Sequence, residues 1–195
     1  MAEPVRTSPL AGVAMPERSI TGAEPVTLTA LPFCGKLILR AGDSARGPAA
    51  MALGVDLPGV MQSAAVGQTE ALWLGPGEWL VLTGSDQADA TAASLRTALA
   101  GTHHAVVVVS DRMAGIGLAG ARARDVLNAG CPLDLHPSAF APDAVTRTVL
   151  AKAPVVLRRP AEPEAFELWV NGSFAPYAWL FLENAAREFG VAIAA

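Results

Sequence analysis

The chain has 195 residues, of which 52% are hydrophobic and only 16% charged, with a formal net charge of −4 at pH 7. This length allows one domain with a full core, while the absence of a Lys/Arg-rich run argues against nucleic acid as a partner. An ordinary soluble domain has about 25% charged residues, so the low charge favours a subunit with a permanent partner, although an alanine-rich chain with an ordinary surface remains the alternative.

The N-terminal segment, residues 1–24, mixes Pro, Ser, Thr, Gly and charged residues without a helical or strand period. We expect an extended arm that is either disordered or lies along a partner, followed by one globular domain over residues 25–195. The arm has no apolar stretch of signal-peptide length, and the longest aliphatic run, residues 105–109, is far too short to cross a bilayer. The protein is therefore expected in the cytoplasm, with Cys34 and Cys131 as two reduced thiols.

From residue 25 onward a short apolar strand, a polar turn and an alanine-rich helix recur. The unit is visible in KLILRAGDSARGPAAMALG, EWLVLTGSDQADATAASLRTALAG, IGLAGARARDVLNAG and ELWVNGSFAPYAWLFLENAARE. Candidate pairing strands precede these units at residues 26–30, 71–74, 105–109 and 145–157, the last broken near Pro154. Gly75-Pro76-Gly77 has the residues of a type II turn between antiparallel neighbours. The pattern predicts an α+β fold of antiparallel sheets with helices on one face, and we take the repeat as architecture rather than as proof of duplication.

Residues 115–120, GIGLAG, match the glycine spacing of a dinucleotide-binding turn. Such a turn must follow a strand directly, but residues 110–114 intervene here. The acidic residue expected about 20 positions later would be Asp134, which lies between two prolines where a central strand is disfavoured. We therefore predict a strand over residues 116–119, with Gly120 turning the chain into a helix near Ala121, and keep a nucleotide-binding module as the weaker alternative.

Other reactive groups are scattered. The adjacent His103 and His104 would point to opposite faces of a strand, and neither they nor His136 have the neighbours of a metal shell, so solvated or core histidines are expected. Walker, nucleophile-elbow and HExxH motifs do not occur. We read three glutamates as a solvated charge run in an exposed hairpin loop: Glu162, Glu164 and Glu167. The sequence thus assigns no catalytic, cofactor-binding or metal-ligating residue.

The last predicted helix begins at Pro176, a residue favoured at the first helical position. Its residues 177–182, YAWLFL, are apolar around the whole circumference, whereas a surface helix needs only one apolar stripe. Something must cover its outer side. The candidates are another element of the same core, or a neighbouring subunit that meets Tyr177 and Trp179 as aromatic anchors.

Four segments in this order give a resemblance that runs from about residue 72 to residue 190. They are LGPGEWLVL, SDRMAGIGLAGARARDVLNAGCPLDLHPSAF, TRTVLAKAPVVLRR and FELWVNGSFAPYAWLFLENAAREFG. With these spacings the chain resembles the gamma subunit family of heterotetrameric sarcosine oxidase. That family is similar in fold to the folate-binding domain of the glycine-cleavage T-protein, which agrees with the strand and helix pattern.

The resemblance implies a complex of four different chains that oxidises sarcosine to glycine. Such a complex makes hydrogen peroxide and either forms 5,10-methylenetetrahydrofolate or releases formaldehyde. FAD, FMN, NAD, tetrahydrofolate and zinc are implied in the alpha, beta and delta subunits, and no cofactor is implied in the gamma chain.

The T-protein's paired aspartate has no counterpart here, because residues 144–165 contain no aspartate. The signature KGCYxGQE of another folate-binding branch is also missing. We therefore expect a non-catalytic structural subunit. The alternative is a stand-alone folate or one-carbon-binding protein of the T-protein type, which would rest on fold analogy alone.

Overall fold

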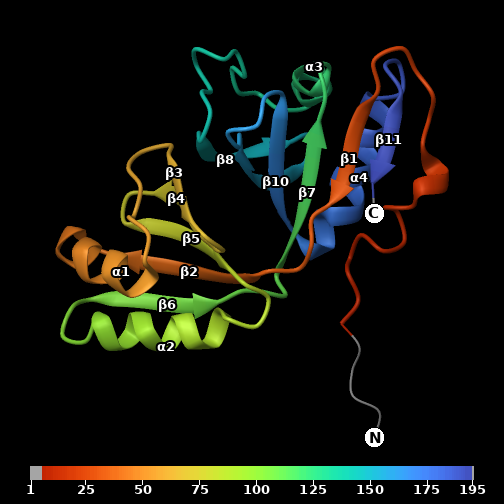
Figure 1. Ribbon diagram of the computed structural model, residues 1–195. Coiled ribbons are helices and arrows are strands. Elements are labelled where there is room, and N and C mark those ends of the chain that lie inside the picture. The colour runs from red at the N-terminus through yellow and green to blue at the C-terminus, as the bar shows by residue number, and fades with distance from the viewer. Residues whose placement is uncertain (1–5, 195) are drawn as a thin grey trace, which may run out of the picture.

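A computed structural model describes residues 6–194 and shows two mainly antiparallel sheets flanked by helices (Figure 1). The six-stranded sheet has the order β11-β1-β7-β10-β9-β8, formed by β1 (Val26–Ala30), β7 (Met113–Ala119), β8 (Val145–Leu150), β9 (Ala153–Arg158), β10 (Ala165–Asn171) and β11 (Val191–Ala194). The five-stranded sheet has the order β3-β4-β5-β2-β6, formed by β2 (Gly35–Ala41), β3 (Ser63–Val66), β4 (Thr69–Gly75), β5 (Glu78–Thr83) and β6 (His104–Val108). The helices are α1 (Arg46–Leu53), α2 (Ala88–Ala98), α3 (Ala123–Asn128) and α4 (Ala175–Ala185).

All four predicted strand–helix units are present, as β2–α1, β5–α2, β7–α3 and β10–α4. Each sheet uses two of them in the same way: β2 and β5 are neighbours in one sheet, and β7 and β10 in the other. The predicted turn at residues 75–77 joins the antiparallel strands β4 and β5, and Gly77 takes the positive φ of 68° that such a turn requires. The predicted α+β architecture is therefore confirmed.

Successive side chains along each strand point to opposite faces of its sheet, and the buried hydrophobic side chains form three clusters. Even-numbered β10 residues such as Leu168 join α3 and α4 in the first cluster, whereas Trp169 faces the other sheet. In β5, Trp79 joins α1 and α2 in the second cluster, whereas Leu80 faces the six-stranded sheet. The third cluster therefore lies between the sheets, with the helices on their outer faces.

Two predicted hairpins do not form. Neither β1 with β2 nor β6 with β7 is a pair, because the members of each couple lie in different sheets. Instead residues 26–41 pair with residues 104–119 along one antiparallel ribbon that crosses from sheet to sheet. The Leu31 amide donates to the Gly115 carbonyl (3.0 Å) and the Val109 amide to the Lys36 carbonyl (2.8 Å) where the ribbon bends. This bent ribbon covalently links the two halves of the fold.

Residues 10–24 lie along the chain's own β11 and α4, whereas Arg6 forms an ion pair with Asp111 at 2.9 Å. Leu10 is buried in the first cluster, and the Ile20 amide donates to the Val191 carbonyl at 2.7 Å. Arg18 forms a two-pronged ion pair with the buried Glu183, with N···O distances of 2.7 and 3.1 Å. From the sequence we expected this arm either to be disordered or to lie along a partner. Contacts between residues so far apart in the chain leave no local pattern from which they could be predicted. The domain boundary at residue 24 stays a prediction.

Candidate functional site

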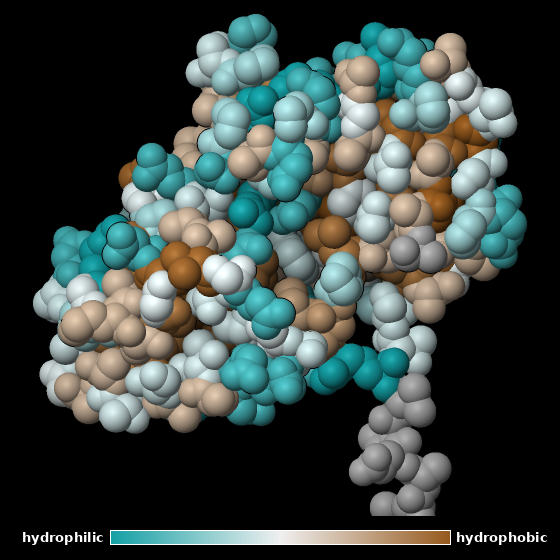
Figure 2. All heavy atoms as spheres, in the orientation of Figure 1, coloured by the Kyte–Doolittle hydropathy of each residue, from teal (hydrophilic) through white to brown (hydrophobic). Residues whose placement is uncertain are grey.

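A cleft of about 410 Å³ opens between the inner faces of the two sheets. Ile38, Glu78 and Val107 line it from the five-stranded sheet, and Thr148 and Trp169 from the six-stranded sheet. In the space-filling view the two sheets form lobes that meet along a junction where apolar and polar atoms are mixed (Figure 2). The cleft has the size and the largely apolar lining of a small binding site.

Strand register arranges the cleft floor in rows. The first two rows are Ala105–Arg40–Glu78 and Val107–Ile38–Leu80, each written across β6, β2 and β5. The Arg40 side chain is 65% exposed, whereas Lys36, two residues before Ile38, is only 1% exposed. The cleft floor therefore passes from an exposed polar row at Arg40, the cleft mouth, to an apolar row at Ile38.

Positive charge prevails in the cleft lining. The charged residues that line the cleft are Arg40, Arg112, Arg147 and Glu78. The Glu78 carboxylate accepts hydrogen bonds from Arg147 and forms an ion pair with Arg40 at 3.4 Å, and the Arg147 guanidinium holds the pKa of Glu78 below its ordinary value. Arg112 is exposed and forms no ion pair within the described residues. The cleft lining thus carries three arginines against one glutamate and suits an anionic group.

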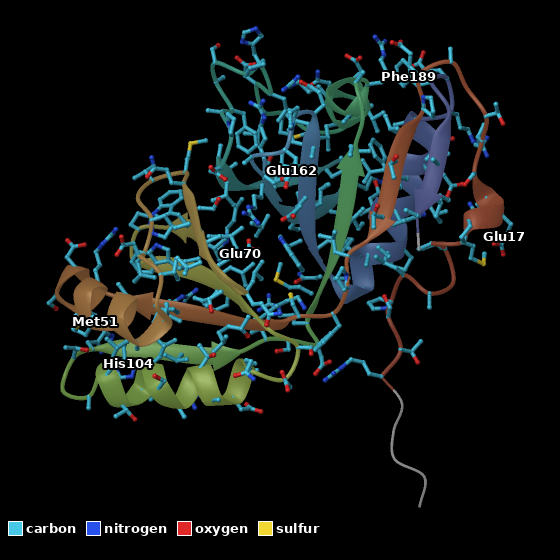
Figure 3. All side chains as sticks on the ribbon, in the orientation of Figure 1. Glu17, Met51, Glu70, His104, Glu162 and Phe189 are labelled. Carbon is cyan, nitrogen blue, oxygen red and sulfur yellow. The ribbon has the colours of Figure 1, made fainter. Side chains whose placement is uncertain are left out.

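Deeper between the sheets, one arginine joins two glutamates. Arg158 of β9 contacts Glu70 of β4, and its Nη1 lies 3.2 Å from a Glu167 oxygen on β10. Figure 3 shows Glu70 on the side of its sheet that faces the six-stranded sheet. Burial raises the pKa of Glu167, Arg158 opposes that rise, and Glu70 adds to it.

The solvated charge run predicted from the sequence is wrong for Glu167. Glu162 is exposed as predicted, and Glu164 is half-buried in an ion pair with Arg124. Glu167, however, lies in β10, because the strand begins at Ala165 directly after the turn. The nearby prolines made the whole segment look like a loop.

The raised pKa of Glu167 predicts a pH-dependent stability. The folded chain keeps this proton at pH values where the unfolded chain has lost it, so the stabilisation is complete below the ordinary glutamate pKa of about 4.3. It is lost as the pH rises through the raised value. Urea unfolding of the purified chain at a series of pH values should show wild-type stability falling over this interval, and Glu167→Gln stability falling less. Identical pH profiles for the two proteins would contradict this assignment.

Lys36 is a buried lysine at the bend of the ribbon. Lys36 Nζ donates to the carbonyls of Cys34 (2.9 Å) and Ser110 (3.1 Å) and lies over the rings of Phe33 and Trp169. Burial lowers the pKa of Lys36 and raises the pKa of the Cys34 thiol. A thiol with a raised pKa is a poor nucleophile, so these contacts indicate a structural link between the two crossing segments. Cys34 and Cys131 are both free.

The GIGLAG segment forms a strand, as predicted. Residues 115–119 belong to β7, which pairs with β1 on one side and β10 on the other, and Gly120 turns the chain with φ 124° toward α3. Because the strand is paired on both sides, the ladders occupy the backbone amides that a pyrophosphate would need. Asp134 instead accepts a hydrogen bond from the His136 amide at 2.9 Å, in a local turn.

The glycines of this strand make room for side chains. A Cβ on Gly115 would lie 2.8 Å from Trp169 Cζ3 and 2.9 Å from Leu31 Cβ, whereas the nearest atom to a Cβ on Gly117 is Leu31 Cδ2 at 3.2 Å. We expect Gly115→Ala to cost about 1–3 kcal/mol of folding free energy by overpacking, and the matched Gly117→Ala less. Urea unfolding monitored by circular dichroism compares them, and a larger loss for Gly117→Ala would contradict the packing role.

The three histidines do not form a cluster. His103 and His136 are exposed, and His104 Nδ1 lies 2.9 Å from the Thr102 carbonyl. Within residues 6–194, no group of three or more His, Cys, Asp or Glu side chains is arranged to hold a metal ion. Over the same range, no helix combines the length and apolar character needed to span a membrane.

The two aromatic residues proposed as partner anchors differ in position. Trp179 is 0% exposed and belongs to the first cluster, so the sequence interpretation of Trp179 as an anchor is corrected: this side chain fills the chain's own core. Tyr177 is 39% exposed and lies between Phe174 (37%) and Leu180 (41%) at intervals of three residues. Phe174 directly precedes α4, and the spacing places the three side chains along one exposed side of the helix and its start, which we call the α4 stripe.

The cleft can bind and orient an anionic group but is poorly equipped for proton transfer. Its cations are arginines, which stay protonated at physiological pH, and its glutamate has a lowered pKa. General acid–base chemistry needs a group whose pKa lies near the working pH. The side chains that line the cleft are therefore suited to binding an anionic group.

Comparison with known proteins identifies the family. Residues 40–188 match the sarcosine oxidase, gamma subunit family. The chain is 34% identical to the sarcosine oxidase subunit gamma of Corynebacterium sp. (strain U-96), over 96% of this chain and 93% of that one. It is 36% identical to the subunit gamma of an Arthrobacter sp., over 90% and 86% of the two chains.

Solved structures agree in fold. A chain of the heterotetrameric sarcosine oxidase from Corynebacterium sp. U-96 superimposes with a TM-score of 0.86 and 34% identity, with 97% of each chain covered. The glycine cleavage aminomethyltransferase T of Bartonella henselae matches with a TM-score of 0.65 and 16% identity, over 86% of this chain and 47% of that one. The second likeness shows the fold alone and does not favour a stand-alone folate-binding protein. The matches over nearly the whole length show that this chain belongs to the sarcosine oxidase gamma subunit family.

Proposed function

We propose that this chain is the non-catalytic gamma subunit of a heterotetrameric sarcosine oxidase and that it acts in assembly of the complex. The observation that carries the proposal is the reciprocal coverage of 97% with a chain of a solved heterotetrameric sarcosine oxidase, at 34% identity. The likeness therefore extends over nearly the whole fold of that chain. The reaction is then the oxidative demethylation of sarcosine to glycine, with hydrogen peroxide and formaldehyde or 5,10-methylenetetrahydrofolate as further products.

The partners in this proposal are the alpha, beta and delta subunits, in the cytoplasm. FAD, FMN, NAD, tetrahydrofolate and zinc belong to those partners. The binding-type chemistry of the cleft supports this division of labour, because its arginines and ion-paired glutamate are unsuited to proton transfer.

The α4 stripe is our candidate for one partner contact. Phe174, Tyr177 and Leu180 expose apolar surface side by side, and exposed aromatic residues of this kind are enriched in interfaces. Tyr177 is the residue we assign to this contact, in place of the buried Trp179.

Co-expression of the four subunits, with and without this chain, tests the proposal. We expect the full set to give a complex of four chains with bound flavin and sarcosine-dependent peroxide formation. Without this chain, the yield of assembled, flavin-loaded complex should fall at least about tenfold, because the partners lose the contacts that this chain makes with them. Unchanged assembly, flavin content and turnover without the chain would overturn the proposed role.

A further inference from the structure

The free edge of β6 is unusually apolar for a solvent-facing strand. β6 is the outermost strand of its sheet and, within the described residues, pairs with β2 alone. Its sequence, HAVVV, contains neither lysine nor proline, and Val107 is 52% exposed. Proteins ordinarily protect edge strands with charges, prolines or covering elements, because unpaired backbone groups there can pair with another chain.

The backbone groups of β6 alternate between its neighbour and the free edge. The Val109 amide points to β2, since it donates to the Lys36 carbonyl. Antiparallel alternation therefore turns the backbone groups of Val106 and Val108 toward the free edge. The Val106 carbonyl accepts a hydrogen bond from Arg96 at 2.9 Å, which agrees with this direction. Because Arg96 already occupies the Val106 carbonyl, a strand arriving at this edge would pair through the other outward-facing backbone groups of Val106 and Val108.

The same strand borders the cationic cleft. Val107 lines the cleft beside Ile38, and the row above it contains Arg40. Arg40 and Arg147 share the single Glu78, and Arg112 adds a further positive charge to the lining. This local surplus stands out against the chain's net charge of −4. An extended segment on β6 would thus place alternate side chains over an apolar row and over arginines.

We propose, on the basis of the proposed function, that β6 and the cleft mouth bind an extended segment of a partner subunit that carries a carboxylate. The segment adds a strand to the edge of β6, places an apolar side chain against Val107 and Ile38, and directs its carboxylate to Arg40 and Arg147, while Arg112 adds to the positive charge of the cleft lining. Strand addition of this kind uses main-chain hydrogen bonds for affinity and alternate side chains for specificity.

Two other occupants fit the surface less well. A small anion in the cleft would satisfy the arginines but would leave the edge of β6 and Val107 uncovered. A second copy of this chain would bring two sets of the same arginines together, and like charges repel across an interface. A partner strand that carries a carboxylate would both pair with the backbone of the β6 edge and neutralise the positive charge of the arginines.

The experiment uses the three partner subunits, co-expressed and purified through a tag on one of them, and variants of this chain that are purified separately. Val107→Lys places a cation on the edge strand, and Val66→Lys is its matched control, because Val66 is a 59% exposed valine on the opposite edge of the same sheet. Arg112→Glu reverses one charge that forms no ion pair within the described residues. Binding of the separately purified variants to the tagged partner subunits is measured by titration, with circular dichroism as the folding check.

We expect Val107→Lys and Arg112→Glu to weaken binding at least about tenfold, and Val66→Lys to bind as the wild type does. In hydrogen exchange, amides of residues 104–108 should exchange at least about tenfold more slowly in the complex than in the free chain. The inference is overturned if both test variants bind normally, if Val66→Lys fails equally, or if exchange at β6 is the same in both states. If the wild-type chain itself does not join the complex, the proposed function fails instead.

Discussion

Replacing Trp179 with alanine is expected to destabilise the folded chain by about 3–5 kcal/mol, the usual cost of emptying a large buried aromatic site. Trp179 is 0% exposed and packs in the first cluster between α4 and the six-stranded sheet. Its Nε1 has no hydrogen-bond partner within the described residues, so the loss comes from packing. Thermal and urea unfolding followed by circular dichroism measure the change.

Two further variants test whether the loss at Trp179 comes from core packing or from a partner contact. Trp179→Phe keeps a ring in the site and loses no hydrogen bond, so it should cost clearly less than Trp179→Ala. Tyr177→Ala removes an exposed ring from the same helix and should change stability by no more than about 1 kcal/mol while weakening association with the partners. If Trp179→Ala instead left stability intact and abolished association, the original interpretation of Trp179 as an anchor would be right.

The second large effect is expected at Arg158. Arg158→Met removes the one cation between Glu70 and Glu167 and leaves two carboxylates facing each other between the sheets. A wholly buried pair broken in this way costs 3–5 kcal/mol, but the two glutamate side chains are 29% and 23% exposed and can be partly hydrated. We therefore expect about 2–4 kcal/mol.

A double variant separates charge from packing at this position. Arg158→Met with Glu167→Gln removes one carboxylate charge and keeps the apolar volume, so much of the lost stability should return. Arg187→Met, at an exposed arginine after α4, serves as the control and should be close to neutral. Urea unfolding at neutral pH provides all four values, and an Arg158→Met protein as stable as the wild type would show that the cluster does not hold the sheets together.

The sequence predicted well what depends on neighbouring residues. Strand–turn–helix order, the turn at residues 75–77 and the strand nature of GIGLAG all rest on local periodicity and turn chemistry, and all were confirmed. Strand partners depend on contacts far apart in the chain. Residues 26–41 find residues 104–119 rather than one another, and no local signal announces such a pairing.

The candidate site was missed for the same reason. Arg40 and Glu78 are opposite each other on β2 and β5, which are far apart in sequence, and Arg147 of β8 joins them only when the two sheets face each other. A lysine at the start of an apolar strand is ordinarily solvent-exposed, but Lys36 is buried where the ribbon bends. A glycine in a strand can indicate that another group packs closely against it. The sequence does not show that this group is the Trp169 side chain at Gly115.

The central claim is that this chain works as one subunit of a four-chain complex, and native mass spectrometry of the complex purified from its host tests it most directly. We expect a single dominant species containing one copy of this chain and one of each of three partners, including the flavin-bearing chains. Detection of this chain only as a free monomer or homodimer, beside flavin-bearing partners that assemble without it, would contradict the account.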